Sequence, residues 1–172
     1  MTEPHQANTP WPRYSARPFP SSRFVPDRSL HPRHNSNNHR FGLEEPRLVL
    51  LPPDQWSQSD DYLYGIDLYN YAYWWECHEV FEELWNIAGH SSEQGNFFQA
   101  LIQLAAANLK LCTGSQQAAR NLLRRGLVRL GRVPESYMGV DVTGLIKAVQ
   151  QQTTETTAKA PPIRLSLPSM NP

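Results

Sequence analysis

The chain lacks the features that would tie it to a membrane or to a disulfide framework. Its two cysteines, Cys77 and Cys112, form no CxxC pair and fall at apolar helical positions, so we expect two reduced core residues. The longest apolar run, near residues 101–109, is too short to span a bilayer and is interrupted by Gln103 and Asn108. The N-terminus has no charged-then-apolar signal pattern. We therefore expect a cytoplasmic protein with no membrane contact.

Proline is absent from residues 56–133, whereas ten of the fifteen prolines lie in residues 1–55. A second change of composition follows Gln152, where threonine and proline dominate. Such segments bury too little apolar surface to order themselves without help. We predict three parts: a Pro/Arg/His-rich arm over 1–55, partly ordered; a helical bundle domain over 56–150; and a flexible tail over 151–172.

A strong charge of one sign is also missing, because the net charge of the whole chain is zero. Residues 1–47 carry seven arginines and four acidic residues, a net charge of +3. Residues 56–150 carry seven basic and ten acidic residues, a net charge of −3. Since the predicted folded part has no strong positive field, nucleic acid is not an expected partner of the bundle.

Strand signals and glycine-rich phosphate loops are absent, and apolar residues recur instead at helical spacing. The loops between the expected helices are short, which implies antiparallel neighbours. The sequence therefore predicts an all-α fold: an up-and-down helical bundle of four to five helices with an extended Pro-rich N-terminal arm. Five helices are expected. The first begins at Ser59, the second covers 73–88 and ends at Gly89, and the third runs from a Ser91–Gln94 capping box to Cys112. The fourth begins after Ser115, and the fifth covers 142–150 after an Asp141 N-cap.

The most informative stretch is Trp-Trp-Glu-Cys-His-Glu-Val-Phe-Glu-Glu-Leu-Trp at residues 74–85. Helical spacing places Trp75, His78, Glu82 and Trp85 on one stripe, with the two polar side chains between tryptophans. Indole walls lower the local dielectric constant, which strengthens an interaction with an ion or a proton. An imidazole with a nearby carboxylate can supply two metal ligands, or a general base and the group that fixes its tautomer. The pattern therefore indicates a functional site.

Candidate roles follow from this stripe. The His-Glu-x-x-His zinc motif fails because position 82 is Glu, so a metal would need further ligands from elsewhere. The candidates are His78, Glu79 and Glu82 for catalysis; Trp75, Trp85, Asn70 and Gln103 for ligand binding; and His78, Glu82, His31 and His39 for a divalent metal, with Asp67 as a further potential ligand.

Two blocks of the sequence resemble a known family. Residues 69–85 (Tyr-Asn-Tyr-Ala-Tyr-Trp-Trp-Glu-Cys-His-Glu-Val-Phe-Glu-Glu-Leu-Trp) and 98–107 (Phe-Gln-Ala-Leu-Ile-Gln-Leu-Ala-Ala-Ala) resemble the signature of domain of unknown function 309. The resemblance implies an all-α bundle and brings no established activity; metal binding is only a suggestion. Ala72 stands where the family tends to have glycine, so we expect a turn there without positive φ.

Three function classes stay open. The first is a protein with a His/Glu polar site between tryptophans, as a metal-binding protein, a metal-dependent enzyme or a metal-free ligand pocket. The second is a structural or protein-interaction module, in which His78 and Glu82 form a core polar network with Gln103, Asn70 or Tyr73. The third is a nucleic-acid binder through the basic arm. Broad apolar helix faces also make a two-fold homodimer an expectation.

Overall fold

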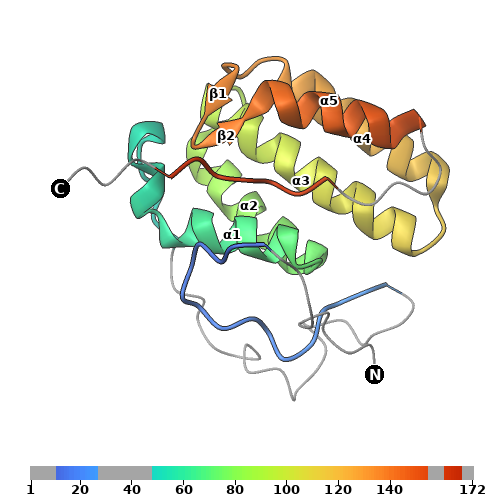
Figure 1. Cartoon of the computed structure of the whole chain (residues 1–172), viewed down its shortest axis with the longest axis horizontal. Helices are drawn as coiled ribbons and strands as arrows, with labels where there is room; N and C mark the ends of the chain where they lie inside the picture. The colour runs from blue at the N-terminus through green and yellow to red at the C-terminus, as the bar shows by residue number, and fades with distance from the viewer. Residues whose placement is uncertain (1–10, 27–47, 155–160, 168–172) are drawn as a thin grey trace.

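The computed structural model describes residues 11–26, 48–154 and 161–167 (Figure 1). These residues form a helical bundle that carries one short β-hairpin, so the prediction of an all-α bundle is confirmed. Helix α3 lies at the centre and packs against α2 on one side and α4 on the other. In chain order the elements are the 3-10 helix η2 (Pro53–Gln58), α1 (Asp60–Asn70), α2 (Trp74–Ala88), α3 (Glu93–Cys112), α4 (Gln116–Leu130), β1 (Ser136–Tyr137), β2 (Val140–Asp141) and α5 (Val142–Thr154).

The helix boundaries follow local capping. Ser59 caps α1 by accepting a hydrogen bond from the backbone N–H of Tyr62, as an N-cap serine should. The capping box predicted at Ser91 is wrong. Ser92 is the N-cap instead, and its Oγ accepts from the N–H of Gly95 at 2.8 Å. The Gln94 side chain turns away from the helix start and donates to the carbonyl of Leu51 at 3.0 Å, so it cannot complete the box.

The two-stranded hairpin was not expected from the sequence. Strands β1 and β2 are antiparallel, and Met138 and Gly139 between them both have positive φ, 47° and 78°. A two-residue turn of this kind matches the right-handed twist of the strands. Each strand has only two residues, which is too short for an alternating pattern to be visible. The expected Asp141 cap is present, since its Oδ1 accepts from the N–H of Gly144 at 2.9 Å.

The turn between α1 and α2 also differs from expectation. Ala72 adopts φ 64°, so the prediction of a turn without positive φ is wrong. The N–H of Ala72 donates to the carbonyl of Tyr69 at 3.1 Å, and the N–H of Tyr73 donates to the carbonyl of Leu68 at 2.9 Å. These two bonds close the C-terminus of α1 and hold the alanine in the left-handed region, at a cost of about 1–2 kcal/mol.

An aromatic cluster fills the centre of the bundle. The fully buried Tyr62 ring lies 6.3 Å, centroid to centroid, from the rings of Phe81, Phe97 and Phe98. Its hydroxyl donates to the carbonyl of Met138 at 2.8 Å, so the polar end of this core side chain is satisfied and tied to the hairpin. The cluster therefore joins α1, α2, α3 and the hairpin.

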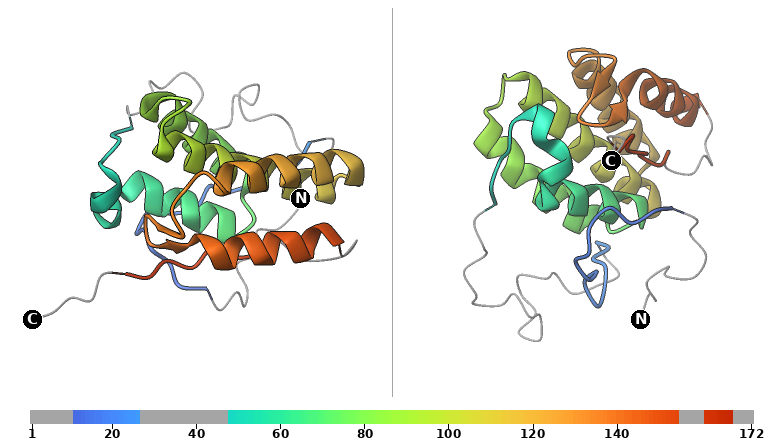
Figure 2. Two further views of the ribbon diagram at one scale, coloured as in Figure 1. Left: turned by 90° about the horizontal axis from the view of Figure 1, so that it is seen from above. Right: turned by 60° about the vertical axis from the view of Figure 1, so that its left-hand side comes forward.

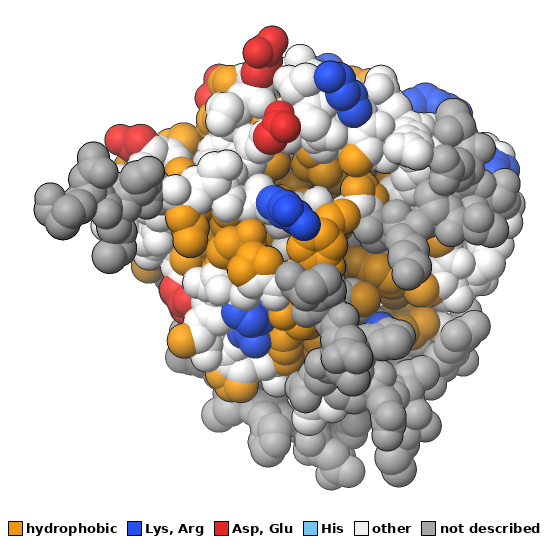
Figure 3. Space-filling view, in the orientation of Figure 1, with side chains coloured by type: hydrophobic (Ala, Val, Ile, Leu, Met, Phe, Trp, Pro, Cys, Tyr) orange, Lys and Arg blue, Asp and Glu red, His pale blue; other side chains and the backbone are white. Residues whose placement is uncertain are grey.

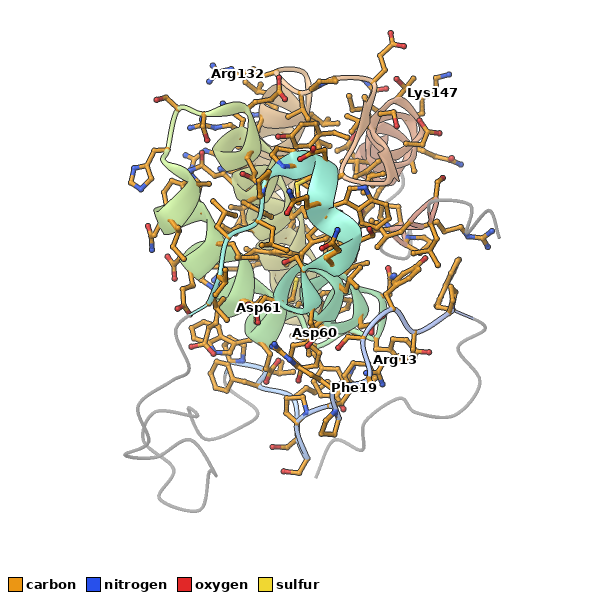
Figure 4. All side chains as sticks on the ribbon, turned by 90° about the vertical axis from the view of Figure 1, so that its left-hand side faces the viewer. Arg13, Phe19, Asp60, Asp61, Arg132 and Lys147 are labelled. Atoms are coloured by element: carbon orange, nitrogen blue, oxygen red, sulfur yellow. The ribbon has the colours of Figure 1, made fainter. Side chains whose placement is uncertain are left out.

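Residues 11–26 of the N-terminal arm lie against α1 and α2, on the far side of the bundle from α4 and α5 (Figure 2). The buried Asp67 carboxylate accepts from the Arg13 side chain at 2.9 Å and from the backbone N–H groups of Tyr14 and Ser15. Arg17 pairs with Asp60 and Asp61. These two carboxylates lie on the same side of the molecule as Arg13 and Phe19 (Figure 4). The arm is thus held by charge-assisted hydrogen bonds.

The structure differs from the predicted flexible tail at residues 161–167. This segment runs between α1 and α5 to the hairpin (Figure 1), and the Ile163 side chain is 1% exposed. Leu165 forms an antiparallel bridge with Val140. The Thr/Pro-rich composition wrongly predicted flexibility here, because a few apolar residues are enough to order a segment when the bundle offers an apolar surface on which they can pack. The domain boundaries at 55/56 and 150/151 stay predictions.

Candidate functional site

His78 lies on α2 with its imidazole stacked on the indole of Trp75, one turn earlier. The ring centroids are 5.6 Å apart and the ring planes differ by 25°. The Nδ1 atom of His78 is buried and has no hydrogen-bond partner among the residues that the structure describes. The sequence therefore placed His78 correctly beside a tryptophan, and the structure adds that one of its nitrogens is buried and unpaired.

Two glutamines of α3 present the complementary chemistry. Gln99 and Gln103 are four residues apart, and the Oε1 atom of each is buried without a hydrogen-bond partner in the described part of the chain. The rings of Phe81 and Phe98 stack with centroids 6.0 Å apart, which fixes the relative height of α2 and α3. The four-residue connection between α2 and α3 makes the two helices antiparallel. The helical turn of α2 that precedes Phe81 therefore lies beside the helical turn of α3 that follows Phe98. Gln103 therefore lies near the level of His78.

Two indole N–H groups of α2 share the same property. Within residues 11–26, 48–154 and 161–167, the buried Nε1 atoms of Trp74 and Trp85 have no hydrogen-bond partners. Trp74, His78 and Trp85 fall on one stripe of the helix, at spacings of four and seven residues. The indole of Trp85 also stacks on the imidazole of His90, with ring centroids 4.0 Å apart. We refer to Trp74, His78, Trp85, Gln99 and Gln103 together as the α2–α3 cluster, a row of polar atoms that extends about 16 Å along α2 from Trp74 to Trp85.

Two of the partners that the sequence suggested for His78, Glu82 and Asn70, are exposed or engaged elsewhere. Glu82 is exposed, and no ion pair among the described residues joins it to His78. Asn70 is hydrogen-bonded to the backbone of Ile163. Asp67 is occupied by the arm. Among the described residues, no hydrogen bond joins the Nδ1 atom of His78 to Glu82, Gln103 or Asn70, and the core polar network stays a prediction.

The structure brings together few groups that could hold a metal ion. In the described ranges, no three side chains of His, Cys, Asp or Glu come together in a potential metal-binding group. His31 and His39, the other two predicted metal ligands, lie outside the described residues. Glu79, the third catalytic candidate, is partly buried one residue from His78 along α2. Metal binding therefore stays a prediction that rests on His78 and Glu82.

Cys77 precedes His78 but belongs to the hydrophobic core. Its side chain is 0% exposed, and burial, assisted by the charge of Glu76, raises the pKa of the thiol well above its ordinary value. A buried thiol with a raised pKa is a poor nucleophile, because the thiolate is the reactive form. The prediction that Cys77 is a reduced core residue is confirmed, whereas the other free cysteine, Cys112, is exposed and not a core residue.

The sequence analysis did not single out Trp74 and Gln99 as members of the cluster, nor His90, which stacks on Trp85. A signal for Gln99 was present, since it lies four residues before Gln103 on a helix that is otherwise largely apolar. The unpaired state of these atoms was not visible in the sequence, because it depends on what the neighbouring helices supply.

The comparison with protein families agrees with this architecture. Residues 62–122, which cover most of α1, all of α2 and α3 and part of α4, match the family model described as "Domain of unknown function (DUF309)". Residues 62–122 are a DUF309 domain. The resemblance seen in the sequence is thus confirmed, and the α2–α3 cluster lies entirely inside the DUF309 match. No curated protein matches the chain. No helix in the described ranges has both the length and the apolar character that crossing a bilayer requires.

Proposed function

We propose that the α2–α3 cluster binds a neutral polar organic molecule through hydrogen bonds, with His78 near its centre. The observation that carries this proposal is that five polar atoms on two adjoining helices are buried without hydrogen-bond partners among the described residues. Folded proteins pair about 90% or more of such atoms, and each unpaired one costs about 1–3 kcal/mol. Proteins commonly retain costs of this kind at functional sites. A ligand that pairs these atoms would remove the cost.

The donor and acceptor pattern suggests the class of ligand. Gln99 and Gln103 offer carbonyl oxygens, which need N–H or O–H donors, whereas the indoles of Trp74 and Trp85 need acceptors. The imidazole nitrogen of His78 can take either role. Since none of the five side chains carries a fixed charge, the cluster favours a neutral molecule with both donors and acceptors, such as an amide, a sugar or a nucleoside. The aromatic rings add apolar contact area.

A divalent metal is the second candidate. An imidazole nitrogen without a hydrogen bond is also a ligand for transition metals, and the carboxylate of Glu82 follows one helical turn later. This reading needs at least one more ligand from outside the described groups, so it is the less supported of the two. We assign no reaction to the site. We also expect a cytoplasmic location, because Cys77 and Cys112 are free thiols, as reducing compartments favour.

The test uses the indole N–H signals of the full-length protein in ¹⁵N-labelled nuclear magnetic resonance spectra. Amides, sugars, nucleosides and zinc chloride are titrated separately. At least one organic class should shift the Trp74 or the Trp85 signal, leave that of Trp56 unchanged, and raise the melting temperature. His78→Phe, which keeps an aromatic ring over Trp75, should abolish the effect, whereas Gln117→Met on the exposed face of α4 should not. If zinc alone moves these signals, the metal reading replaces this proposal. If nothing moves them, both readings fail.

A further inference from the structure

The C-terminal segment 161–167 sits in the bundle as an extended peptide. Pro161, Ile163 and Leu165 are buried, whereas the intervening Arg164 and the following Ser166 are exposed. This alternation is that of a β-strand with one face on a protein surface. Figure 3 shows hydrophobic side chains gathered across this face of the molecule, where α1, α5 and the segment meet. The face lies apart from the α2–α3 cluster, since its contacts come from other elements.

The backbone of the segment is recognised at successive residues. The Asn70 side chain binds Ile163 in both directions: its Nδ2 donates to the Ile163 carbonyl and its Oδ1 accepts from the Ile163 N–H, each at 2.8 Å. The N–H of Leu165 donates to the Tyr14 hydroxyl at 3.0 Å, and the N–H of Ser166 donates to the Gly139 carbonyl at 2.8 Å. Main-chain bonds of this kind, with alternate side chains buried, are how proteins bind peptides by adding a strand.

The buried side chains supply selectivity. Ile163 is 1% exposed and Leu165 is 8% exposed, so each buries an apolar group worth about 1.5–3 kcal/mol. Arg164 projects outward and places its guanidinium 4.7 Å from the centroid of the Trp11 ring. The bundle therefore recognises the segment by two buried apolar side chains, an outward-pointing arginine and main-chain hydrogen bonds.

The hydrogen bonds that join the segment to other described residues come from α1, the hairpin and the arm, and none of these bonds involves α5, the helix that precedes it in the chain. A segment from another molecule would find the same groups in the same places. The covalent link supplies only a high effective concentration, of millimolar order for short linkers. The contacts that hold the segment therefore do not depend on its covalent connection to α5, and a docking site for a separate peptide requires contacts of this kind.

We propose that the strip between α1 and the hairpin is a peptide-docking site, and that the segment 161–167 of a second copy of this chain can occupy it in place of the chain's own segment. The second copy is the fitting occupant because it carries the same Ile-Arg-Leu pattern that the site already accommodates. Exchange in both directions closes a two-fold dimer, the commonest form of homo-oligomer.

Two full-length variants test this proposal by complementation. Asn70→Ala damages the docking site and keeps the segment, whereas Ile163→Asp damages the segment and keeps the site. Each alone should be a monomer by light scattering, and an equimolar mixture at about 100 µM should form a 1:1 complex of twice the mass, because only the mixture pairs an intact site with an intact segment. Leu167→Asp, a charge at a position that is 59% exposed, is the matched control and should not complement Asn70→Ala.

A second measurement uses a fluorescent synthetic peptide with the sequence of residues 161–167. It should bind Ile163→Asp at least tenfold more tightly than the wild-type chain, in which the tethered segment competes, and a scrambled peptide should bind neither. Three results would overturn the proposal: a mixture that stays monomeric while both variants keep their helical circular dichroism, a peptide that does not bind folded Ile163→Asp, or an Ile163→Asp chain that does not fold. The last would show that the segment is an inseparable part of the bundle.

Discussion

Gly65 of α1 lies directly against the ring of Phe81 of α2. A Cβ atom placed on Gly65 would come within 2.6 Å of the Phe81 ring, closer than real Cβ contacts allow. The absence of a side chain at residue 65 therefore sets how closely α1 approaches α2. Because Phe81 precedes Glu82 and follows His78 by three residues, this contact also fixes the height of the candidate site relative to the rest of the bundle.

The first prediction concerns this contact. Gly65→Ala should lower the free energy of unfolding by about 1–3 kcal/mol, because the added methyl group forces the buried Phe81 ring to move. Urea denaturation followed by circular dichroism measures the change. Gly131→Ala is the control, since a Cβ there meets no atom closer than 3.6 Å, and it should leave stability unchanged or slightly raised. Equal losses in both variants would contradict the close-contact explanation.

The second prediction concerns the arm. Asp67→Asn should lower stability by about 2–3 kcal/mol, because the buried carboxylate accepts from Arg13 and from two backbone N–H groups, and bonds to a charged acceptor are worth about 1.5–3 kcal/mol each. Asp60→Asn, at a carboxylate that is 51% exposed, should cost less than about 1 kcal/mol. Limited proteolysis should cut near residue 13 faster in Asp67→Asn. An arm equally protected in both variants would argue against Asp67 as its anchor.

The third prediction concerns the strained alanine. Ala72→Gly should raise stability by up to about 1 kcal/mol, since glycine adopts positive φ without the penalty that alanine bears. Ala106→Gly, in the middle of α3, should lower stability by roughly 1 kcal/mol because its backbone is helical. Thermal melts of both variants give the comparison. A loss of stability in Ala72→Gly would mean that the methyl group of Ala72 makes contacts that outweigh its backbone strain.

The sequence predicted the helices well because their boundaries depend on local information. Ser59 as a cap and Gly89 as a stop act within one turn, and the apolar periodicity is read directly from the chain. The pairing of polar groups is not local. Asp67 was treated as a potential metal ligand, yet it anchors an arm more than 50 residues away in the sequence. Likewise, Ile163 and Leu165 looked too sparse to order a tail until Asn70 and the hairpin supplied a surface.

In the candidate site, too, local features could be predicted from the sequence and the pairing of polar groups could not. Of the two tryptophans predicted to flank His78, Trp75 stacks on its imidazole, whereas Trp85 stacks on His90 instead. That His78, Gln99 and Gln103 each keep a buried unpaired atom could not be predicted, because hydrogen-bond satisfaction depends on the separation and rotation of α2, α3 and their neighbours.

The fourth prediction concerns the two thiols. Cys112 is exposed and should react with iodoacetamide at pH 8, whereas Cys77 should react only after unfolding. Burial raises the pKa of Cys77, so the thiolate is scarce until the pH rises well above the ordinary value of the thiol. Mass spectrometry of the alkylated protein, with and without urea, distinguishes the two sites. Rapid labelling of Cys77 in the native protein would indicate that α2 opens readily.

The central claim is that the α2–α3 cluster holds polar atoms at a cost to stability, and the free energies of unfolding of Gln103→Met and Asn108→Leu test it most directly. Asn108 is the matched control on the same helix, because its buried side chain is hydrogen-bonded at both its amide nitrogen and its amide oxygen. It donates to the Tyr69 hydroxyl at 3.2 Å and accepts from the Gln152 side chain at 3.0 Å. Asn108→Leu should lose about 1–3 kcal/mol by leaving those partners unpaired. Gln103→Met keeps the side-chain length and should gain about 0.5–2 kcal/mol by removing an unpaired buried oxygen. A loss in Gln103→Met as large as that in Asn108→Leu would contradict the account and assign Gln103 to an ordinary structural role.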